Sequence, residues 1–378
     1  MIDIIDKKDC VGCNACVQRC PKQCISMHED DQGFLYPKVD LSHCIHCNLC
    51  EKVCPVINQA EPRKPLETFA AKNTDDVVRM SSSSGGIFYA LAEKIIEDGG
   101  IVFGARFNEQ WEVVHDYAET LEGVKAFQGS KYVQSRIGET FQQTEKFLKT
   151  GRRVMFTGTP CQIAGLSLFL RKEYSNLLAV DVACHSVPSP KVWKDYIDSK
   201  KDITYDSINF RDKTNGWLNY GFSLTDKNNC MFYQKSSENV YMRGFLNDLY
   251  SRPSCATCPA KAGKSGSDIT IADFWGIWDV KPEFDSHMGA SAVIVNSNKG
   301  NNAINKLSDV DFEKVSYEDI IRHNSALIKS AKLPEQRMVF WQRFNNEGIE
   351  CIIPIVRSMQ PSFFTRLARF IGRNLGFK

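Results

Sequence analysis

The chain of 378 residues lacks a strong charge of either sign: its 47 Lys and Arg and 45 Asp and Glu give a formal net charge of only +2. This balance gives no support to a protein that binds nucleic acid through bulk electrostatics. The sequence also lacks a run of about 18 apolar residues, so we expect no helix that spans a bilayer. Because no basic stretch followed by an apolar core stands at the start, we expect no secretory signal and a cytoplasmic protein.

Nucleotide-binding fingerprints are missing as well. No G-x-G-x-x-G follows a predicted strand, and the string Ala262 to Ser265 resembles the end of a phosphate loop whose first glycine is replaced by Cys258. We therefore predict neither a nicotinamide site nor an ATP site. Cysteine, by contrast, is abundant: the chain has 15, and nine of them lie in the first 54 residues. An odd number with tight local spacing favours metal ligation over a disulfide framework.

The first sixty residues contain the same cysteine pattern twice, C-x2-C-x2-C-x3-C followed by proline. This is the run of bacterial two-cluster ferredoxins, in which the fourth cysteine of each run binds the other cluster. Zinc sites or disulfides are the alternative, but zinc ribbons usually use separated C-x2-C pairs. The spacing predicts two 4Fe-4S clusters with crossed ligation, one held by Cys10, Cys13, Cys16 and Cys54 and the other by Cys44, Cys47, Cys50 and Cys20. Cys24 lies outside the pattern, and we expect it to be a packed side chain.

Beyond this module the pattern changes to alternating helices and strands. Gly33 to Pro37 is predicted to form a ferredoxin hairpin strand, whereas helices near 87–98, 137–149 and 161–171 alternate with buried strands near 101–103, 153–156 and 177–182. Strand, crossover helix and strand indicate a parallel sheet. We therefore predict an α+β ferredoxin-like iron–sulfur module followed by a larger α/β domain with a mixed, partly parallel sheet. The expected division is 1–60 ferredoxin domain, 61–68 linker, 69–150 first α/β part, 151–310 flavin and third-cluster part, and 311–378 C-terminal region.

Four more cysteines lie in predicted loops of the large domain, two of them directly after strands, where open parallel sheets bind ligands. Three interpretations remain open for them: a third 4Fe-4S cluster, a zinc site, or a redox pair in the C-x2-C segment with two structural cysteines. The four are Cys161, Cys184, Cys255 and Cys258. For Cys230 and Cys351, which have no such pattern, we expect burial.

Two strand–loop–helix segments are suited to anionic or flavin groups, since backbone N–H groups and the helix dipole can face a phosphate. An ordinary helix cap is the alternative for the first. Four further polar residues stand in structured contexts: Lys131, Tyr132, His185 and Asp273. We expect them either to contact a flavin or move a proton, or to be ordinary surface or capping residues. The cofactor-binding candidates are Ser83, Ser84, Gly85, Gly86, Lys131, Tyr132, Thr157, Gly158, Thr159 and Asp273; weak catalytic candidates are His185, Lys131 and Asp273.

The C-terminal tail, residues 361–378, has apolar residues at helical spacing together with four basic and no acidic residues. This pattern predicts either a helix that contacts a membrane surface or a partner protein, or a helix packed on its own domain. In the first case the protein lies at the inner face of the membrane. Association of identical chains is left open.

Several strings in fixed order resemble the coenzyme F-420 hydrogenase/dehydrogenase beta-subunit family, whose members often carry such a ferredoxin domain. The likeness covers residues 1–300 and consists of SSSSGGIFYAL, GSKYVQS, TGTPCQIAGL, ACHSVPSP, INFRDK, SRPSCATC and SDITIADFWG. One departure is Ser186, where the family leads us to expect glycine. The resemblance implies FAD in the large domain and strengthens the third cluster. The family includes reductases of the deazaflavin coenzyme, of ferredoxin-linked substrates and of a chlorophyll-cycle intermediate, and bacterial members found among polysaccharide-assembly genes.

The leading hypothesis is therefore an iron–sulfur flavoprotein oxidoreductase. Electrons from ferredoxin or another redox protein would pass singly through the clusters to FAD, which delivers pairs to a small-molecule substrate, either the deazaflavin coenzyme or an intermediate of polysaccharide biosynthesis. The alternatives are a non-catalytic electron-transfer subunit of a larger redox complex and a redox sensor whose clusters control a partner.

Overall fold

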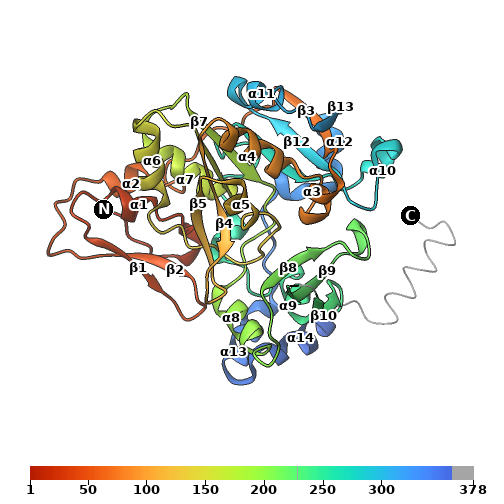
Figure 1. Cartoon of the computed structure of the whole chain (residues 1–378). Coiled ribbons are helices and arrows are strands. Elements are labelled where there is room, and N and C mark those ends of the chain that lie inside the picture. Colours follow the sequence, from red (N-terminus) through yellow and green to blue (C-terminus); the bar gives the residue numbers. More distant parts are fainter. Residues whose placement is uncertain (228, 360–378) are drawn as a thin grey trace, which may run out of the picture.

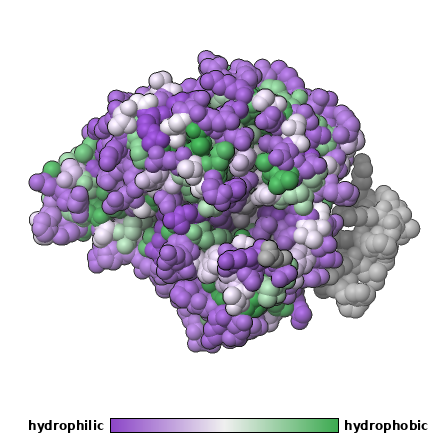
Figure 2. All heavy atoms as spheres, in the orientation of Figure 1, coloured by the Kyte–Doolittle hydropathy of each residue, from purple (hydrophilic) through white to green (hydrophobic). Residues whose placement is uncertain are grey.

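The computed structural model describes residues 1–227 and 229–359 (Figure 1). Within this part no helix has the length and apolarity needed to cross a membrane. The predicted amphipathic segment 361–378 lies outside the described residues. On the face in Figure 2, hydrophilic residues cover most of the surface and apolar residues form small, separate groups.

The N-terminal module is a small α+β unit. Its short helices are η1 (Lys7–Asp9), α1 (Ala15–Arg19) and α2 (Leu49–Lys52), and its antiparallel hairpin is β1 (Ile25–Glu29) with β2 (Leu35–Val39). The hairpin strand therefore begins two residues later than predicted. In Figure 1 this module lies beside α6 and α7 of the larger part, and α1 packs on both helices.

A mixed sheet of eight strands organises the larger part of the described chain, as predicted from the alternation of strands and helices. Its order is β13-β3-β12-β11-β7-β6-β4-β5, with the pairs β11–β7, β7–β6 and β6–β4 parallel and the others antiparallel. The strands in chain order are β3 (Glu67–Asn73), β4 (Ile101–Phe107), β5 (Val113–Ala118), β6 (Val154–Gly158), β7 (Leu177–Val182), β11 (Ile269–Asp273), β12 (Ser291–Val295) and β13 (Val310–Lys314).

Alternating side chains of the central strands face two apolar layers, as the period of two in a strand requires. Val154 and Phe156 of β6 pack with the helices on one face, whereas Met155 packs with those on the other. The first face carries α6 (Thr140–Lys149) and α7 (Pro160–Leu170); the second carries α4 (Ile87–Glu97), α5 (Leu121–Lys125) and α11 (Asn298–Ile304). The sheet is thus a buried central layer, typical of parallel strands.

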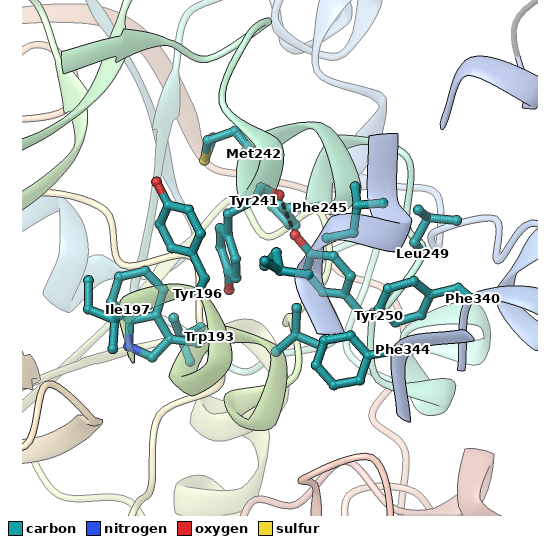
Figure 3. Close-up of a cluster of buried hydrophobic side chains, with 14 of the residues drawn as sticks. Trp193, Tyr196, Ile197, Tyr241, Met242, Phe245, Leu249, Tyr250, Phe340 and Phe344 are labelled. Carbon is teal, nitrogen blue, oxygen red and sulfur yellow. Dashed lines mark hydrogen bonds between the residues drawn. The ribbon is translucent and has the colours of Figure 1, made fainter. Parts of the chain in front are cut away.

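A second lobe is built around the antiparallel sheet β8 (Ser207–Asp212), β9 (Gly221–Asp226) and β10 (Asn229–Lys235). Its core is aromatic: Trp193 lies 5.1 Å from Phe210 between ring centroids, and Phe210 lies 5.3 Å from Phe222. Figure 3 shows Tyr250 reaching Tyr241 by a hydrogen bond beside Phe340. The helices of this lobe are α8 (Pro190–Asp198), α9 (Val240–Leu246), α13 (Gln336–Glu347) and α14 (Ile352–Met359).

The remaining α-helices of the described residues are α3 (Asp76–Ser81), α10 (Ile277–Val280) and α12 (Tyr317–His323). Strand β3 begins at Glu67 and pairs with β12, so the end of the expected linker already belongs to the sheet. Strand β13 crosses the expected boundary at residue 310 and pairs with β3. Helices α13 and α14 pack into the aromatic core, so the described part of 311–378 joins both sheets.

Candidate functional site

The structure brings one cysteine of the second ferredoxin run beside three of the first. Burial and the nearby charges of Cys16, Cys10 and Cys54 raise the pKa of Cys13, and burial with the charges of Cys10 and Cys54 raises the pKa of Cys16. Four thiols gathered in this way are suited to a positively charged metal centre, which stabilises thiolates. This group has the composition predicted for the first crossed cluster, and we call it the inner group.

The other four cysteines of the two runs line one small hollow near the surface of the module. The hollow is lined by Cys20, Cys44, Cys47 and Cys50, and also by Cys24. Cys47 is exposed, whereas Cys50 is buried and its Sγ accepts a hydrogen bond from the N–H of Ile2 at 3.2 Å. This outer group matches the second crossed set. Cys24 is buried and its Sγ lies 3.4 Å from that of Cys20, as expected for a packed side chain.

Three separate loops bring the remaining group of cysteines together. Cys161 lies in the first turn of α7, Cys184 follows β7, and Cys255 and Cys258 lie in and just after the short helix η3 (Pro253–Thr257). Burial, with the charges of Cys258 and Cys184, raises the pKa of Cys161 to about 12. Burial also raises the pKa of Cys184 and of Cys255 to about 12, and in each case two other thiols of the group contribute. We call these four the sheet-edge group.

Within the residues that the structure describes, no three His, Cys, Asp or Glu side chains are arranged to hold a single metal ion. A 4Fe-4S cube binds its four thiolates through four different irons and so spaces them more widely than one ion does. The convergence of soft thiolates in each of the three groups fits such a cube. Cys351 is buried as expected, but Cys230 is exposed, so the expectation of burial for Cys230 is wrong; its strand, β10, lies at the edge of the small sheet.

The serine-rich loop is held mainly by bonds within the protein. Ser83 Oγ lies 2.9 Å from Ser130 Oγ, Ser84 Oγ donates to the carbonyl of Ala290 at 2.6 Å, and the N–H of Gly85 donates to Ser291 Oγ at 2.9 Å. A Cβ at Gly85 would lie 2.5 Å from a backbone carbonyl, so this position needs glycine. Gly86 precedes α4 with φ of +85° and provides no side-chain cap, which leaves the first N–H groups of the helix without that partner.

Behind this loop, Tyr132 and Asp273 meet at one buried cation. The Arg211 guanidinium donates to both carboxylate oxygens of Asp273 at 3.0 and 3.1 Å, to the Tyr132 hydroxyl at 3.3 Å and to the carbonyl of Ser83 at 3.4 Å. Trp217 Nε1 donates to the same carboxylate at 2.9 Å. The arrangement joins three flavin candidates that are far apart in the sequence.

Other flavin candidates lie at the carboxyl end of β6. The Thr157 hydroxyl donates to the carbonyl of Phe103 at 2.8 Å, and the N–H of Thr159 donates to Gln162 Oε1 at 2.9 Å. A Cβ added at Gly158 would lie 3.6 Å from His115 Nε2. His115 itself is buried, and this burial lowers its pKa to about 4.

Lys131 and His185, the catalytic candidates besides Asp273, have different hydrogen-bond partners. The Lys131 ammonium donates to the carbonyls of Gln128 and Gly129 at 2.9 and 3.2 Å, and burial lowers its pKa to about 7. His185 Nε2 lies 3.0 Å from Asp248 Oδ2. The hydroxyl of Ser186, where glycine was expected, donates to the other oxygen of Asp248 at 3.0 Å and so belongs to the same polar network.

Sequence reasoning missed several charged residues that the fold brings to these sites. Arg211 stands in the string INFRDK, where polar and apolar residues are mixed and no spacing or motif indicates a role for one cation. Lys261 donates to the carbonyls of Cys184 and Ala326, and its charge favours the thiolate of Cys184. A cavity of about 30 Å³ beside them is lined by Cys184, Lys261 and the buried Asp181, among others.

Comparison with known proteins gives two family matches. Residues 9–58 match the 4Fe-4S dicluster domain, and residues 151–319 match the family described as the C terminus of the coenzyme F420 hydrogenase/dehydrogenase beta subunit. None of the curated proteins matches the chain. Among solved structures, a chain of the F420-reducing [NiFe] hydrogenase complex from Methanosarcina barkeri, studied by xenon derivatization, is 17% identical with a TM-score of 0.48, over 72% of this chain and 97% of that one. The chain is thus similar to the 4Fe-4S dicluster domain over residues 9–58, and to the C terminus of the coenzyme F420 hydrogenase/dehydrogenase beta subunit over residues 151–319.

Proposed function

We propose that this protein is an iron–sulfur flavoprotein oxidoreductase. Single electrons from a ferredoxin or another redox protein enter at the outer cluster, held by Cys20, Cys44, Cys47 and Cys50, and pass to the inner cluster. A third cluster at the sheet-edge group then delivers them to FAD, and a small molecule receives them in pairs. The dicluster domain supports the iron–sulfur part of this proposal.

The observation that carries the proposal is the contact between the two cysteine regions along α7. A Cβ added at Gly165 would lie 2.9 Å from both Cβ and Sγ of Cys13, so the inner group lies directly against this helix. Cys161 of the sheet-edge group stands four residues earlier on the same helix, about 6 Å along its axis. The exposed Cys47 stands at the other end of the series, where a protein donor can approach. The three groups thus form a continuous series from the surface to the sheet edge.

The residues around Arg211 support a flavin site, and they form the chain's own contribution to the chemistry. Bound FAD would supply the exchange between one-electron and two-electron transfer. The Arg211 guanidinium orients Asp273 and the Tyr132 hydroxyl, and it ties the Ser83 carbonyl to them. The N-terminus of α4, with Gly86 ahead of it, offers N–H groups and a dipole to an anionic group. The partly exposed Asp273 carboxylate is the group best suited to hold or move a proton there.

Iron and flavin analysis of the full-length protein, purified without oxygen, tests this function. We expect about twelve irons and about one FAD per chain, and about eight irons in Cys258→Ser. Cys230→Ser is the matched control, because Cys230 is exposed and belongs to none of the three groups. A wild-type protein with about eight irons and one zinc would contradict the third cluster, and one with full iron that binds no added FAD would contradict the flavin.

A non-catalytic electron-transfer subunit is the second candidate, and two observations favour it. The polar groups of Ser83, Ser84 and Gly85 already have partners within the protein, and the cavity next to Cys184 has the volume of a water molecule rather than of a flavin. Protein that oxidises a reduced dye but turns over no added acceptor, with or without FAD, would support this second function. Candidate acceptors are the deazaflavin coenzyme and intermediates of polysaccharide biosynthesis.

A further inference from the structure

A fully buried guanidinium lies at the junction of the ferredoxin module and the larger part. Arg252 is 0% exposed and precedes Cys255 by three residues. Its Nε donates to the carbonyl of Cys10 at 2.8 Å, its Nη2 to the carbonyl of Leu35 at 2.9 Å, and its Nη1 to Gln134 Oε1 at 2.9 Å. A single side chain therefore binds a residue of the inner group and is anchored in the loop of the sheet-edge group.

Throughout residues 1–227 and 229–359, Arg252 has no hydrogen bond or ion pair with a carboxylate, which distinguishes it from other buried arginines. Arg211 is paired with Asp273 and Arg79 with Asp76. An unpaired buried charge is strongly unfavourable, because neutral acceptors do not replace the lost hydration. The Arg252 guanidinium therefore requires another source of negative charge close to it.

Cysteines lie on both sides of this cation. A Cβ added at Gly12, inside the first cysteine run, would lie 2.9 Å from Arg252 Nη1 and 3.0 Å from Cζ. On the other side, the charge of Arg252 favours the thiolates of Cys161 and Cys255. The charge of Lys261 likewise favours the thiolate of Cys184, which belongs to the sheet-edge group alone. Four thiolates around a 4Fe-4S core give each cluster a net negative charge, which would compensate the buried guanidinium.

The surroundings of Arg252 exclude water and so strengthen its charge effect. The guanidinium carbon lies 4.3 Å from the ring centroid of Tyr36 and 5.3 Å from that of Phe34, which is fully buried. Aromatic faces attract a cation, but they provide no negative charge to neutralise it. In such a medium of low dielectric constant a charge acts on its neighbours more strongly than at the surface.

We propose that Arg252 is the shared counter-charge of the inner cluster and the sheet-edge cluster, and that it raises the reduction potential of both. This inference rests on the clusters of the proposed function. Reduction adds one electron, and hence one negative charge, to a cluster without making or breaking a bond to Arg252. The fixed cation stabilises that charge, and net charge near a cluster is one of the factors that set its potential. Arg252 is thus a positioning residue rather than a catalytic one.

Redox titration of the full-length protein with dithionite, followed by electron paramagnetic resonance, tests the proposal. In Arg252→Met, which keeps an unbranched side chain of similar reach but no charge, we expect the inner and sheet-edge clusters to become harder to reduce. Their one-electron equilibrium constants should fall about tenfold, a shift of about 59 mV to lower potential. The outer cluster should change less, because the Arg252 side chain donates its hydrogen bonds to Cys10, Leu35 and Gln134 and to no cysteine of the outer group. In Arg252→Lys, which keeps the charge, both potentials should stay near the wild-type values.

A matched control separates charge from docking. Arg19 also links the module to the larger part, through the carbonyl of Phe169, but its charge is paired with Glu145 at 3.2 Å. The double variant Arg19→Met with Glu145→Gln loses this link without changing net charge, so it should lower the melting temperature and leave the inner-cluster potential in place. Arg252→Met with unchanged potentials, or Arg252→Lys shifted as far as Arg252→Met, would overturn the proposal. A wild-type content of about eight irons would mean that the sheet-edge group holds no cluster, and Arg252 could then not be shared between two clusters. The iron content is measured independently of the potentials, so the two failures can be told apart.

Discussion

The N-terminal module and the edge of the large sheet both gather cysteines, but they do so in opposite ways. In the module, two tight loops supply eight cysteines within 45 residues, from Cys10 to Cys54. At the sheet edge, four cysteines come from three loops separated by up to 97 positions, from Cys161 to Cys258. The first site depends on local spacing, whereas the second depends on the parallel pairing of β6 and β7, which brings the ends of these strands together. We therefore expect mutations to affect them differently.

The largest effect is expected from Cys54→Ala. This variant tests whether the fourth cysteine of the second run binds the cluster of the first run. Cys54 lies beside Cys10, Cys13 and Cys16, so its loss should remove or convert the cluster of the first run. Iron should fall by up to about four per chain. Spectra that show damage only to the cluster of Cys44, Cys47 and Cys50 would contradict the crossed arrangement.

A smaller but still severe effect is expected from Asp273→Asn, because the site around it is assembled by tertiary structure. The substitution leaves the buried Arg211 without a carboxylate, and breaking one partner of a buried pair costs about 3–5 kcal/mol. Chemical denaturation should show this loss, together with weaker FAD binding. The exposed pair of Arg343 and Glu347 provides the control: Glu347→Gln should leave the denaturation midpoint close to that of the wild type. Equal losses of stability in the two variants would contradict the role of Asp273 as the partner that compensates the buried charge of Arg211.

The free energy of unfolding should depend on pH through His115, a residue of β5 whose ring stacks on Phe156 of β6. Burial lowers its pKa from 6.5 to about 4 in the folded state. Between these pH values the unfolded chain binds more protons, so stability rises with pH across the window and is lost as the pH falls. The expected contribution is about 3 kcal/mol at most. His115→Phe should flatten this slope, whereas the exposed His28→Phe should leave it in place; a persistent slope in the first variant would contradict this role for His115.

The contact between the two regions should be the most tolerant of change. A side chain at Gly165 would press on Cys13, so Gly165→Val should destabilise the protein by about 1–3 kcal/mol. Ser167→Val, an exposed position on the same helix, is the matched control for the effect of a branched side chain. Melting curves should separate the two, and electron transfer from the module to the sheet edge should slow only in the first. Indistinguishable curves would show that the module does not press on α7.

Much of the fold was predictable because it depends on short-range patterns. The strand Leu177–Val182 was predicted at its observed bounds, since a mainly apolar run is typical of a strand that is buried in a parallel sheet. The helix expected from residue 137 begins at Thr140 instead, and the side chain of Gln18 from the ferredoxin module accepts hydrogen bonds from the first turn of that helix. Such a contact between distant segments has no trace in local spacing.

By itself, the sequence determined the composition of the ferredoxin module, since cysteines two or three residues apart share one loop in any fold. It also indicated the mixed sheet, because apolar periodicity reflects burial. Only the tertiary structure decided which distant groups meet: the Arg211 guanidinium with Asp273 and Tyr132, and the Arg252 guanidinium between Cys10 and the loop of Cys255. The physical reason is that a buried charge is stabilised by whatever partner the packing of several segments brings within hydrogen-bond reach, and that partner can stand anywhere in the chain.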